Sequence, residues 1–200
     1  MKKKIIIDTD PAMGTKGGDP EDCFAIMMAF NSPELEILGI TTVQGNVPVE
    51  RGYSNAAYLI EQFKKDIPLR SGPPNTFNRD RNESRMWLSQ RKEMEQITPL
   101  VKPDKDEEDA ARFIYKTCKE NSREVELVTI GPLTNIAIAL KEYPDVTDHI
   151  NSITMMAGSA KVPGNITPAA EFNVWADPEA ADRVFRSGIP ITMILSLIHI

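Results

Sequence analysis

A continuous β-branched run, Ile5-Ile6-Ile7, near the start of the chain is the feature that most constrains the fold. A strand with one face in water alternates apolar and polar side chains, whereas a continuous apolar run is typical of a strand buried on both faces of a parallel sheet. Parallel strands need long crossover connections, which are usually helices. The run therefore predicts a sheet covered by helices.

The rest of the chain alternates between strand-like and helix-like segments, which favours an α/β fold with a mostly parallel sheet. The segment 72–103 is polar and rich in Pro, so we expect an irregular excursion with one short helix over 87–94. We expect strands over 5–7, 35–43, 67–70, 125–130, 150–156 and 191–194, and helices over 20–30, 49–64, 106–119, 133–142 and 178–186. Asp177 is the expected N-cap of the last helix.

Composition narrows the class of protein. The 200 residues are 41% hydrophobic and 26% charged with a net charge of −6, as expected for a soluble globular domain. An acidic chain has no electrostatic footprint for nucleic acid or for an anionic membrane, so we expect neither as a partner. The two cysteines are far apart and no targeting segment is visible, which favours a cytoplasmic location.

Acidic residues gather after the first expected strand. Asp8 and Asp10 follow it directly, and Asp19, Glu21 and Asp22 stand at the start of the next helix. Carboxylates that converge resist ionisation unless a cation neutralises them, and acids at the end of a buried strand are costly unless paired or coordinated. The alternative interpretation is that the second group only caps the helix, with Asp19 at the N-cap.

Oxygen-bearing side chains, uncharged or acidic, follow the other expected strands. In an open α/β sheet the ligand binds outside the carboxyl ends of the strands, so these loops could share one site. Oxygen ligands favour a hard cation, Ca²⁺ or Mg²⁺, over zinc. Taken singly, each asparagine could equally be a turn residue. The residues are Thr41, Thr42, Gln44, Asn46, Asn135, Asn165, Thr167, Glu171 and Asn173.

The sequence contains five ordered motifs, DTDP at 8–11, TTVQGN at 41–46, GPLTNIA at 131–137, GNITPAAEFN at 164–173 and DPEAA at 177–181. Together they resemble the nucleoside hydrolases. The resemblance implies a Rossmann-like α/β fold with helices on both faces of the sheet and Ca²⁺ at its carboxyl edge. It also implies hydrolysis of the N-glycosidic bond of ribonucleosides to ribose and free base, and a homodimer or homotetramer.

The resemblance also implies roles for individual residues. Asp10 corresponds to the catalytic carboxylate that binds Ca²⁺ and activates the attacking, metal-bound water. Asp22 corresponds to the second metal-binding acid, and Ile130 would offer its backbone carbonyl to the metal. The residues that correspond to ribose contacts are Glu21, Asn46, Met156, Asn165, Glu171 and Asn173.

The chain departs from the family pattern in three places. Ten residues separate Pro11 from Asp22, against three in the family, which leaves Asp19 as a rival to Asp22. Glu21 stands where the family has Asp. The later family segment, with a histidine that helps the base leave and an aspartate that completes the Ca²⁺ shell, has no counterpart here. We therefore expect an incomplete domain over 1–194 and a non-matching apolar tail over 195–200.

Two alternatives to the hydrolase remain open. An apolar strand followed by D-x-D also resembles the haloacid-dehalogenase-like phosphatases, in which Asp8 would be phosphorylated with Asp10 assisting and Mg²⁺ bound. The other alternative is a non-catalytic fragment that binds ribose or metal weakly.

Overall fold

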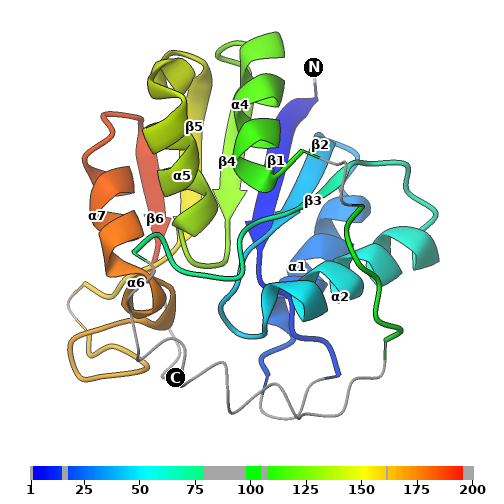
Figure 1. Cartoon of the computed structure of the whole chain (residues 1–200), viewed down its shortest axis with the longest axis horizontal. Coiled ribbons are helices and arrows are strands. Elements are labelled where there is room, and N and C mark those ends of the chain that lie inside the picture. Colours follow the sequence, from blue (N-terminus) through cyan, green and yellow to red (C-terminus); the bar gives the residue numbers. More distant parts are fainter. Residues whose placement is uncertain (1, 15–17, 79–97, 105–107, 161, 196–200) are drawn as a thin grey trace.

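Six strands form one sheet in the order β3-β2-β1-β4-β5-β6 in the computed structural model (Figure 1). The structure describes residues 2–14, 18–78, 98–104, 108–160 and 162–195. Every pair of neighbouring strands in this sheet is parallel. The predicted α/β fold is thus confirmed. The strands are β1 (Lys3–Thr9), β2 (Leu35–Thr42), β3 (Leu69–Ser71), β4 (Val125–Thr129), β5 (Ile150–Met156) and β6 (Ile191–Ile194).

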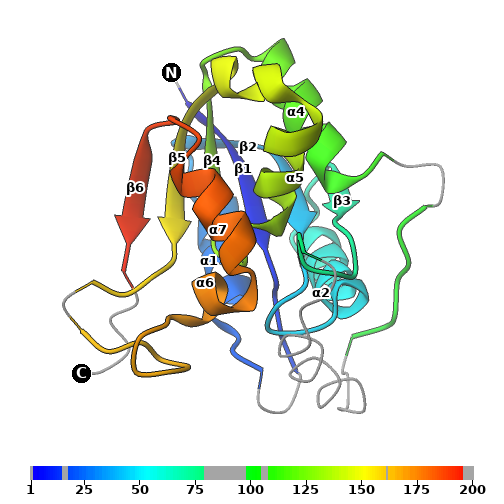
Figure 2. The ribbon, with the colours of Figure 1, turned by 60° about the vertical axis from the view of Figure 1, so that its left-hand side comes forward.

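Helices cover both faces of the sheet, as the Rossmann-like expectation requires. Two apolar clusters show the two sides: α1 and α2 pack with β1, β2 and β3, whereas α4, α5 and α7 pack against the other face (Figures 1 and 2). The helices are α1 (Glu21–Phe30), α2 (Val49–Gln62), α4 (Ala110–Glu120), α5 (Thr134–Glu142), α6 (Phe172–Ala176) and α7 (Pro178–Phe185), with a 3-10 helix η1 over Pro144–Asp148.

The isoleucine run at the centre of β1 explains why both faces need cover. Ile6 belongs to the cluster beneath α4 and α5, while Ile5 and Ile7 belong to the cluster beneath α1 and α2. All three side chains are buried. Because successive residues of a strand point to opposite faces, the run anchors both helical layers at once.

The direction of winding reverses between β1 and β4. From β1 the chain continues outward to β2 and β3, then returns to place β4 on the other side of β1. Loops that leave neighbouring strands in opposite directions open a crevice at the carboxyl edge, where ligands of such sheets bind. The loops after β1 and β4, which begin with Asp10 and Ile130, meet at this point.

The structure corrects the expected start of α1. The helix begins at Glu21 with Pro20 at the N-cap position, and no side chain caps it. Asp19 is not the N-cap, because its backbone nitrogen and oxygen are hydrogen-bonded instead to the side chain of Asn46. The same helix is less buried than its composition suggests, since one side of it faces water: Phe24 is 57% exposed and Met28 71%.

Other differences are small or lie outside the described residues. The helix expected over 106–119 starts only at Ala110, where the carboxylate of Asp109 caps the backbone nitrogen of Arg112. The short helix α6 lies next to a segment predicted as loop and was not predicted. The helix expected over 87–94 lies outside the described residues, as does the tail expected over 195–200 except for its first residue.

Among the described residues, every helix is too short or too polar to span a membrane.

Candidate functional site

Asp10 lies at the centre of the carboxyl edge, in the crevice between β1 and β4. Its side chain is buried, and its Oδ2 accepts a hydrogen bond from the backbone nitrogen of Asn46 at 2.5 Å. Two glycines make room for this carboxylate. A Cβ on Gly45 would overlap Oδ2, and a Cβ on Gly131 would lie 2.7 Å from Oδ1. The loops after β2 and β4 can therefore close around Asp10 only because these positions lack side chains.

Asp22 reaches Asp10 from the first turn of α1. Its Oδ2 accepts hydrogen bonds from the backbone nitrogen of Asp10 at 3.0 Å and from Thr9 Oγ1 at 2.6 Å. Asp22 is 3% exposed, whereas Asp19 is exposed and bonds to Asn46 through its backbone. The structure thus brings Asp22 rather than Asp19 into hydrogen-bonding contact with the end of β1.

Asp8 is a third buried carboxylate at the same edge. Its Oδ1 accepts hydrogen bonds from Thr41 Oγ1 at 2.5 Å and from Asn135 Nδ2 at 2.7 Å. Its Oδ2 is buried and has no hydrogen-bond partner among the described residues. Asp8 points toward α5 rather than toward Asp22, because it shares a face of the sheet with Ile6.

These carboxyl groups are harder to ionise than usual. Burial raises the pKa of Asp8 to about 7. Burial, followed by the charge of Asp22, holds the pKa of Asp10 well above its usual range, and burial also raises the pKa of Asp22. Partial desolvation and a hydrogen bond with Asp19 raise the pKa of Glu21 to about 8. A cation bound among such desolvated acids would stabilise their ionised forms.

The side chains alone do not make a complete metal site. Among the described residues, no three His, Cys, Asp or Glu side chains gather closely enough to hold a metal ion. A cation at Asp10 and Asp22 would therefore need backbone or amide oxygens as well. Because Gly131 packs against the Asp10 carboxylate, the candidate is the carbonyl of the preceding residue, Ile130. It accepts a hydrogen bond from Asn173 Nδ2 at 2.9 Å, which leaves one of its two lone pairs. This donor set of oxygens fits a hard cation such as Ca²⁺.

The residues predicted to contact ribose from the last loops are brought together around α6. Glu171 caps this helix: its Oε1 accepts from the nitrogen of Asn173, and its Oε2 from those of Val174 and Gly158. Asn173 Nδ2 bridges the carbonyls of Ile130 and Met156, the latter also at 2.9 Å. The ends of β4, β5 and α6 are thereby joined beside Asp10.

The remaining residues predicted to contact ribose differ in how directly they contact Asp10 and the loop around α6. Asn165 Oδ1 accepts from the backbone nitrogen of Phe172 and so shapes the loop before α6. Met156 Sδ lies 3.6 Å from Asn173 Nδ2. Asn46 contacts Asp10 through its backbone and uses its side chain to hold Asp19. Glu21 stands at the exposed start of α1.

Sequence reasoning missed one buried carboxylate that connects distant segments. Asp177 Oδ2 accepts hydrogen bonds from the backbone nitrogen of Phe77 and from Thr134 Oγ1, both at 2.6 Å, and Oδ1 accepts from Ala180 at 3.2 Å. The sequence predicted the cap of α7 but not the other two contacts. Nothing local in the pattern indicates them, because Phe77 lies 100 positions away.

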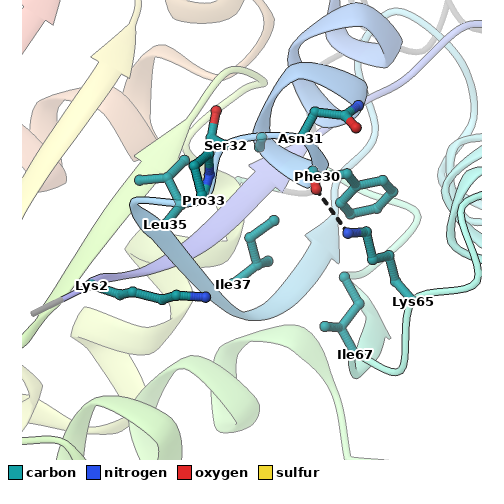
Figure 3. Close-up of a pocket in the computed structure, with 10 residues that line it drawn as sticks. Lys2, Phe30, Asn31, Ser32, Pro33, Leu35, Ile37, Lys65 and Ile67 are labelled. Atoms are coloured by element: carbon teal, nitrogen blue, oxygen red, sulfur yellow. Dashed lines mark hydrogen bonds between the residues drawn. The ribbon is translucent and has the colours of Figure 1, made fainter.

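A separate cavity of about 440 Å³ lies at the opposite, amino-terminal edge of the sheet (Figure 3). Lys2, Phe30, Leu35 and Lys65 contribute to its walls. Lys65 Nζ donates to the carbonyl of Phe30 at 2.7 Å and thereby caps the end of α1. None of the predicted site residues lines this cavity, so it is distinct from the acidic cluster.

Comparison with known proteins agrees with this architecture. Residues 5–198 match the family model described as inosine-uridine preferring nucleoside hydrolase. The chain is 37% identical to uridine nucleosidase 1 of Arabidopsis thaliana, covering 96% of this chain and 56% of that protein. It is 38% identical to the non-specific ribonucleoside hydrolase RihC of Klebsiella pneumoniae, over 96% of this chain and 61% of the relative.

A solved structure shows the same fold. The plant nucleoside hydrolase PpNRh1 superimposes with a TM-score of 0.83 at 31% identity, covering 98% of this chain and 60% of that one. The chain thus spans about three-fifths of the length of the proteins it matches. Because the family model covers nearly the whole sequence and the sheet has the same architecture, the chain belongs to the inosine-uridine preferring nucleoside hydrolase family.

Proposed function

We propose that this protein hydrolyses the N-glycosidic bond of ribonucleosides to ribose and free base, with Ca²⁺ as its cofactor. The observation that supports this most directly is the contact of Asp22 with Asp10, with Gly131 packed against the Asp10 carboxylate, at the switch point of a nucleoside hydrolase fold. The relatives named as uridine nucleosidase and as non-specific ribonucleoside hydrolase agree with this substrate class.

Asp10 is the proposed general base. When bound, Ca²⁺ supplies Lewis acidity that lowers the pKa of a water molecule. Asp10 accepts the proton of the attacking water, for which its carboxylate must be ionised, and a cation beside Asp10 and Asp22 would favour that ionised form. The hydrogen bond from Asn46 and the close approach of Gly45 and Gly131 hold this carboxylate in one orientation.

The pentose is proposed to be held by the loops after β2 and β5. Glu171 and Asn173 are fixed by their hydrogen bonds at the start of α6, so they need little reordering when a sugar binds. Cleavage of a glycosidic bond passes through an oxocarbenium-like state, which nearby carboxylates stabilise electrostatically. Groups placed to pair with ribose hydroxyls also disfavour deoxyribose, since they would be left unpaired.

The phosphatase alternative gains no support from the geometry. It requires Asp8 as the nucleophile, but Asp8 Oδ1 is held by Thr41 and Asn135 on the side of the sheet that α5 covers. The fragment alternative concerns activity only, and the assay below addresses it.

The test is release of reducing sugar from inosine and uridine in the presence of Ca²⁺. We expect activity with at least one nucleoside and a loss of at least about 100-fold in Asp10→Asn, which removes the base. Asp66→Asn, an exposed aspartate, is the matched control and should behave like the wild type.

The assay is run on this chain and on a longer chain that carries the C-terminal segment of the relatives. Activity confined to the longer chain would support the fragment alternative for residues 1–200. Wild-type turnover by Asp10→Asn in whichever chain is active would refute the proposed mechanism, and inactivity of both chains would refute the proposed function.

A further inference from the structure

We propose that Asp8 is a positioning residue for the candidate metal site. Its carboxylate, held by Thr41 and Asn135, fixes the end of β1 and so sets the positions of Asp10 and of the Ile130 carbonyl. This inference rests on the proposed function, because it assumes that a cation binds at Asp10. It concerns a residue that takes no part in the chemistry proposed above.

The contacts of Asp8 join three elements at one oxygen. Thr41 Oγ1 donates to Asp8 Oδ1 from β2, and Asn135 Nδ2 donates to the same atom from the first turn of α5. Each donor is itself buried. Hydrogen bonds to a charged or strongly polar acceptor in a dry interior are directional, so Asp8 Oδ1 fixes these elements relative to one another.

Asn135 extends the connection to the edge of the sheet. Its Nδ2 also donates to the backbone carbonyl of Thr42 at 3.0 Å, and that carbonyl accepts from the backbone nitrogen of Gly72 at 2.8 Å. A Cβ on Gly72 would overlap Asn135 Oδ1. Asn135 is therefore tightly packed between Asp8 and the chain that follows β3.

The backbone of Asp8 carries this constraint to the site. The backbone carbonyl of Asp8 accepts a hydrogen bond from the backbone nitrogen of Ile130 at 2.8 Å. The position of Ile130 therefore depends directly on that of Asp8. The next carbonyl, of Thr9, accepts from Val43 at 3.0 Å, close to the Gly45 that borders Asp10. A displacement of Asp8 therefore moves the two sides of the crevice together.

The carboxylate acts through the shape of its acceptor rather than through its charge. Both partners of Oδ1 are donors, while Oδ2 is buried with no partner. Asparagine in place of Asp8 can present an oxygen at the Oδ1 position and keep both hydrogen bonds. Alanine cannot, and it leaves the donors of Thr41 and Asn135 unsatisfied.

The test is Ca²⁺ affinity measured by isothermal titration calorimetry with CaCl₂ alone. We expect Asp8→Ala to raise the dissociation constant about 10-fold or more, as for other residues that orient metal ligands. Asp8→Asn should stay within about threefold of the wild type, because it keeps the acceptor. Asp177→Ala is the control for a buried carboxylate elsewhere: it should lower the unfolding temperature in EDTA and leave Ca²⁺ affinity unchanged.

Each outcome decides the proposal. Unchanged affinity in Asp8→Ala would overturn it, and an equal loss in Asp8→Ala and Asp8→Asn would overturn it by showing a dependence on charge. If Asp8→Ala does not fold, Thr41→Val and Thr41→Ser replace it: weaker Ca²⁺ binding in the valine variant alone supports the proposal, and wild-type binding in both refutes it. Wild-type binding by Asp10→Asn would instead show that the proposed metal site itself is wrong.

Discussion

Asp22 Oδ2 accepts a hydrogen bond from the backbone nitrogen of Asp10 at 3.0 Å, although the two residues are 12 positions apart. The same oxygen accepts from Thr9 Oγ1, so the start of α1 is tied to the last residue of β1 and to the first residue after it. Loop-closure entropy grows slowly with loop length. A longer connection between β1 and α1 can therefore keep the two acids together.

This contact predicts that Asp22 matters more than Asp19 for cation binding. Asp22→Ala removes the buried carboxylate that contacts the backbone of Asp10, and it should weaken Ca²⁺ binding by at least about 10-fold. Asp19→Ala removes an exposed side chain whose neighbour Asn46 is held through the backbone, so it should change affinity by less than about threefold. Calorimetric titration of both variants checks this, and the reverse order would assign the metal ligand to Asp19.

The space around Asp10 gives a second prediction. Gly131→Ala places a methyl group 2.7 Å from Asp10 Oδ1, which forces the carboxylate or the loop to move. We expect a loss of stability of about 1–3 kcal/mol and weaker Ca²⁺ binding. Thermal unfolding in EDTA and calorimetry in CaCl₂ measure the two effects separately.

Gly52→Ala is the matched control for that substitution. Gly52 lies inside α2, and a Cβ there would meet its neighbours at 3.5 Å or more, which is ordinary contact. Alanine is a better helix former than glycine by about 1 kcal/mol, so this variant should be as stable as the wild type or more so. Equal behaviour of the two alanine variants would contradict the close approach at Gly131.

The sequence predicted most of the sheet, because runs of apolar and β-branched residues leave a strong local signal. β5 and β6 have the predicted bounds, Ile150–Met156 and Ile191–Ile194. The start of α7 was predicted with its cap, Asp177. The start of α1 was not, because Asp19 is engaged by Asn46, a residue from another loop.

In the candidate site too, features that depend on local sequence were predicted, and features that depend on distant contacts were not. The sequence placed Asp10 after the first expected strand, and the family resemblance implied a role for Ile130 at the end of another. The topology makes these two strands, β1 and β4, neighbours. No local pattern could show that Asp8 turns toward Thr41 and Asn135, since those contacts span 33 and 127 positions. Register between strands and the side of the sheet that each residue faces decide such contacts, and both are properties of the assembled sheet.

Asp177 provides a stability prediction. Asp177→Ala removes the cap of α7 and leaves the backbone nitrogen of Phe77 and the hydroxyl of Thr134 without their acceptor. Loss of a cap and exposure of buried donors together should cost about 2–4 kcal/mol. Urea unfolding measures this, and Thr134→Val, which removes a single bond, should cost less. A cost below that of Thr134→Val would show that Asp177 does not join these segments.

Glu126 gives a prediction about acid stability. Burial alone would raise the pKa of Glu126, but hydrogen bonds from Lys3 and Thr154 and the charge of Lys3 lower it below its usual value. The folded state therefore binds fewer protons at this group than the unfolded state does. The stability that Glu126 contributes is present above pH 4.5, the ordinary value, and is lost as the pH falls through the lower value of the folded state.

Glu126→Gln removes this dependence, because glutamine does not titrate. Urea unfolding of wild type and variant between pH 3 and 7, in EDTA, should show the wild type more stable at neutral pH and the difference shrinking as the pH falls below about 4.5. Glu61→Gln, on the exposed side of α2, is the control and should follow the wild type across the range. A wild-type advantage that stays constant down to pH 3 would mean that the Lys3–Glu126 pair does not set the acid limb of the stability curve.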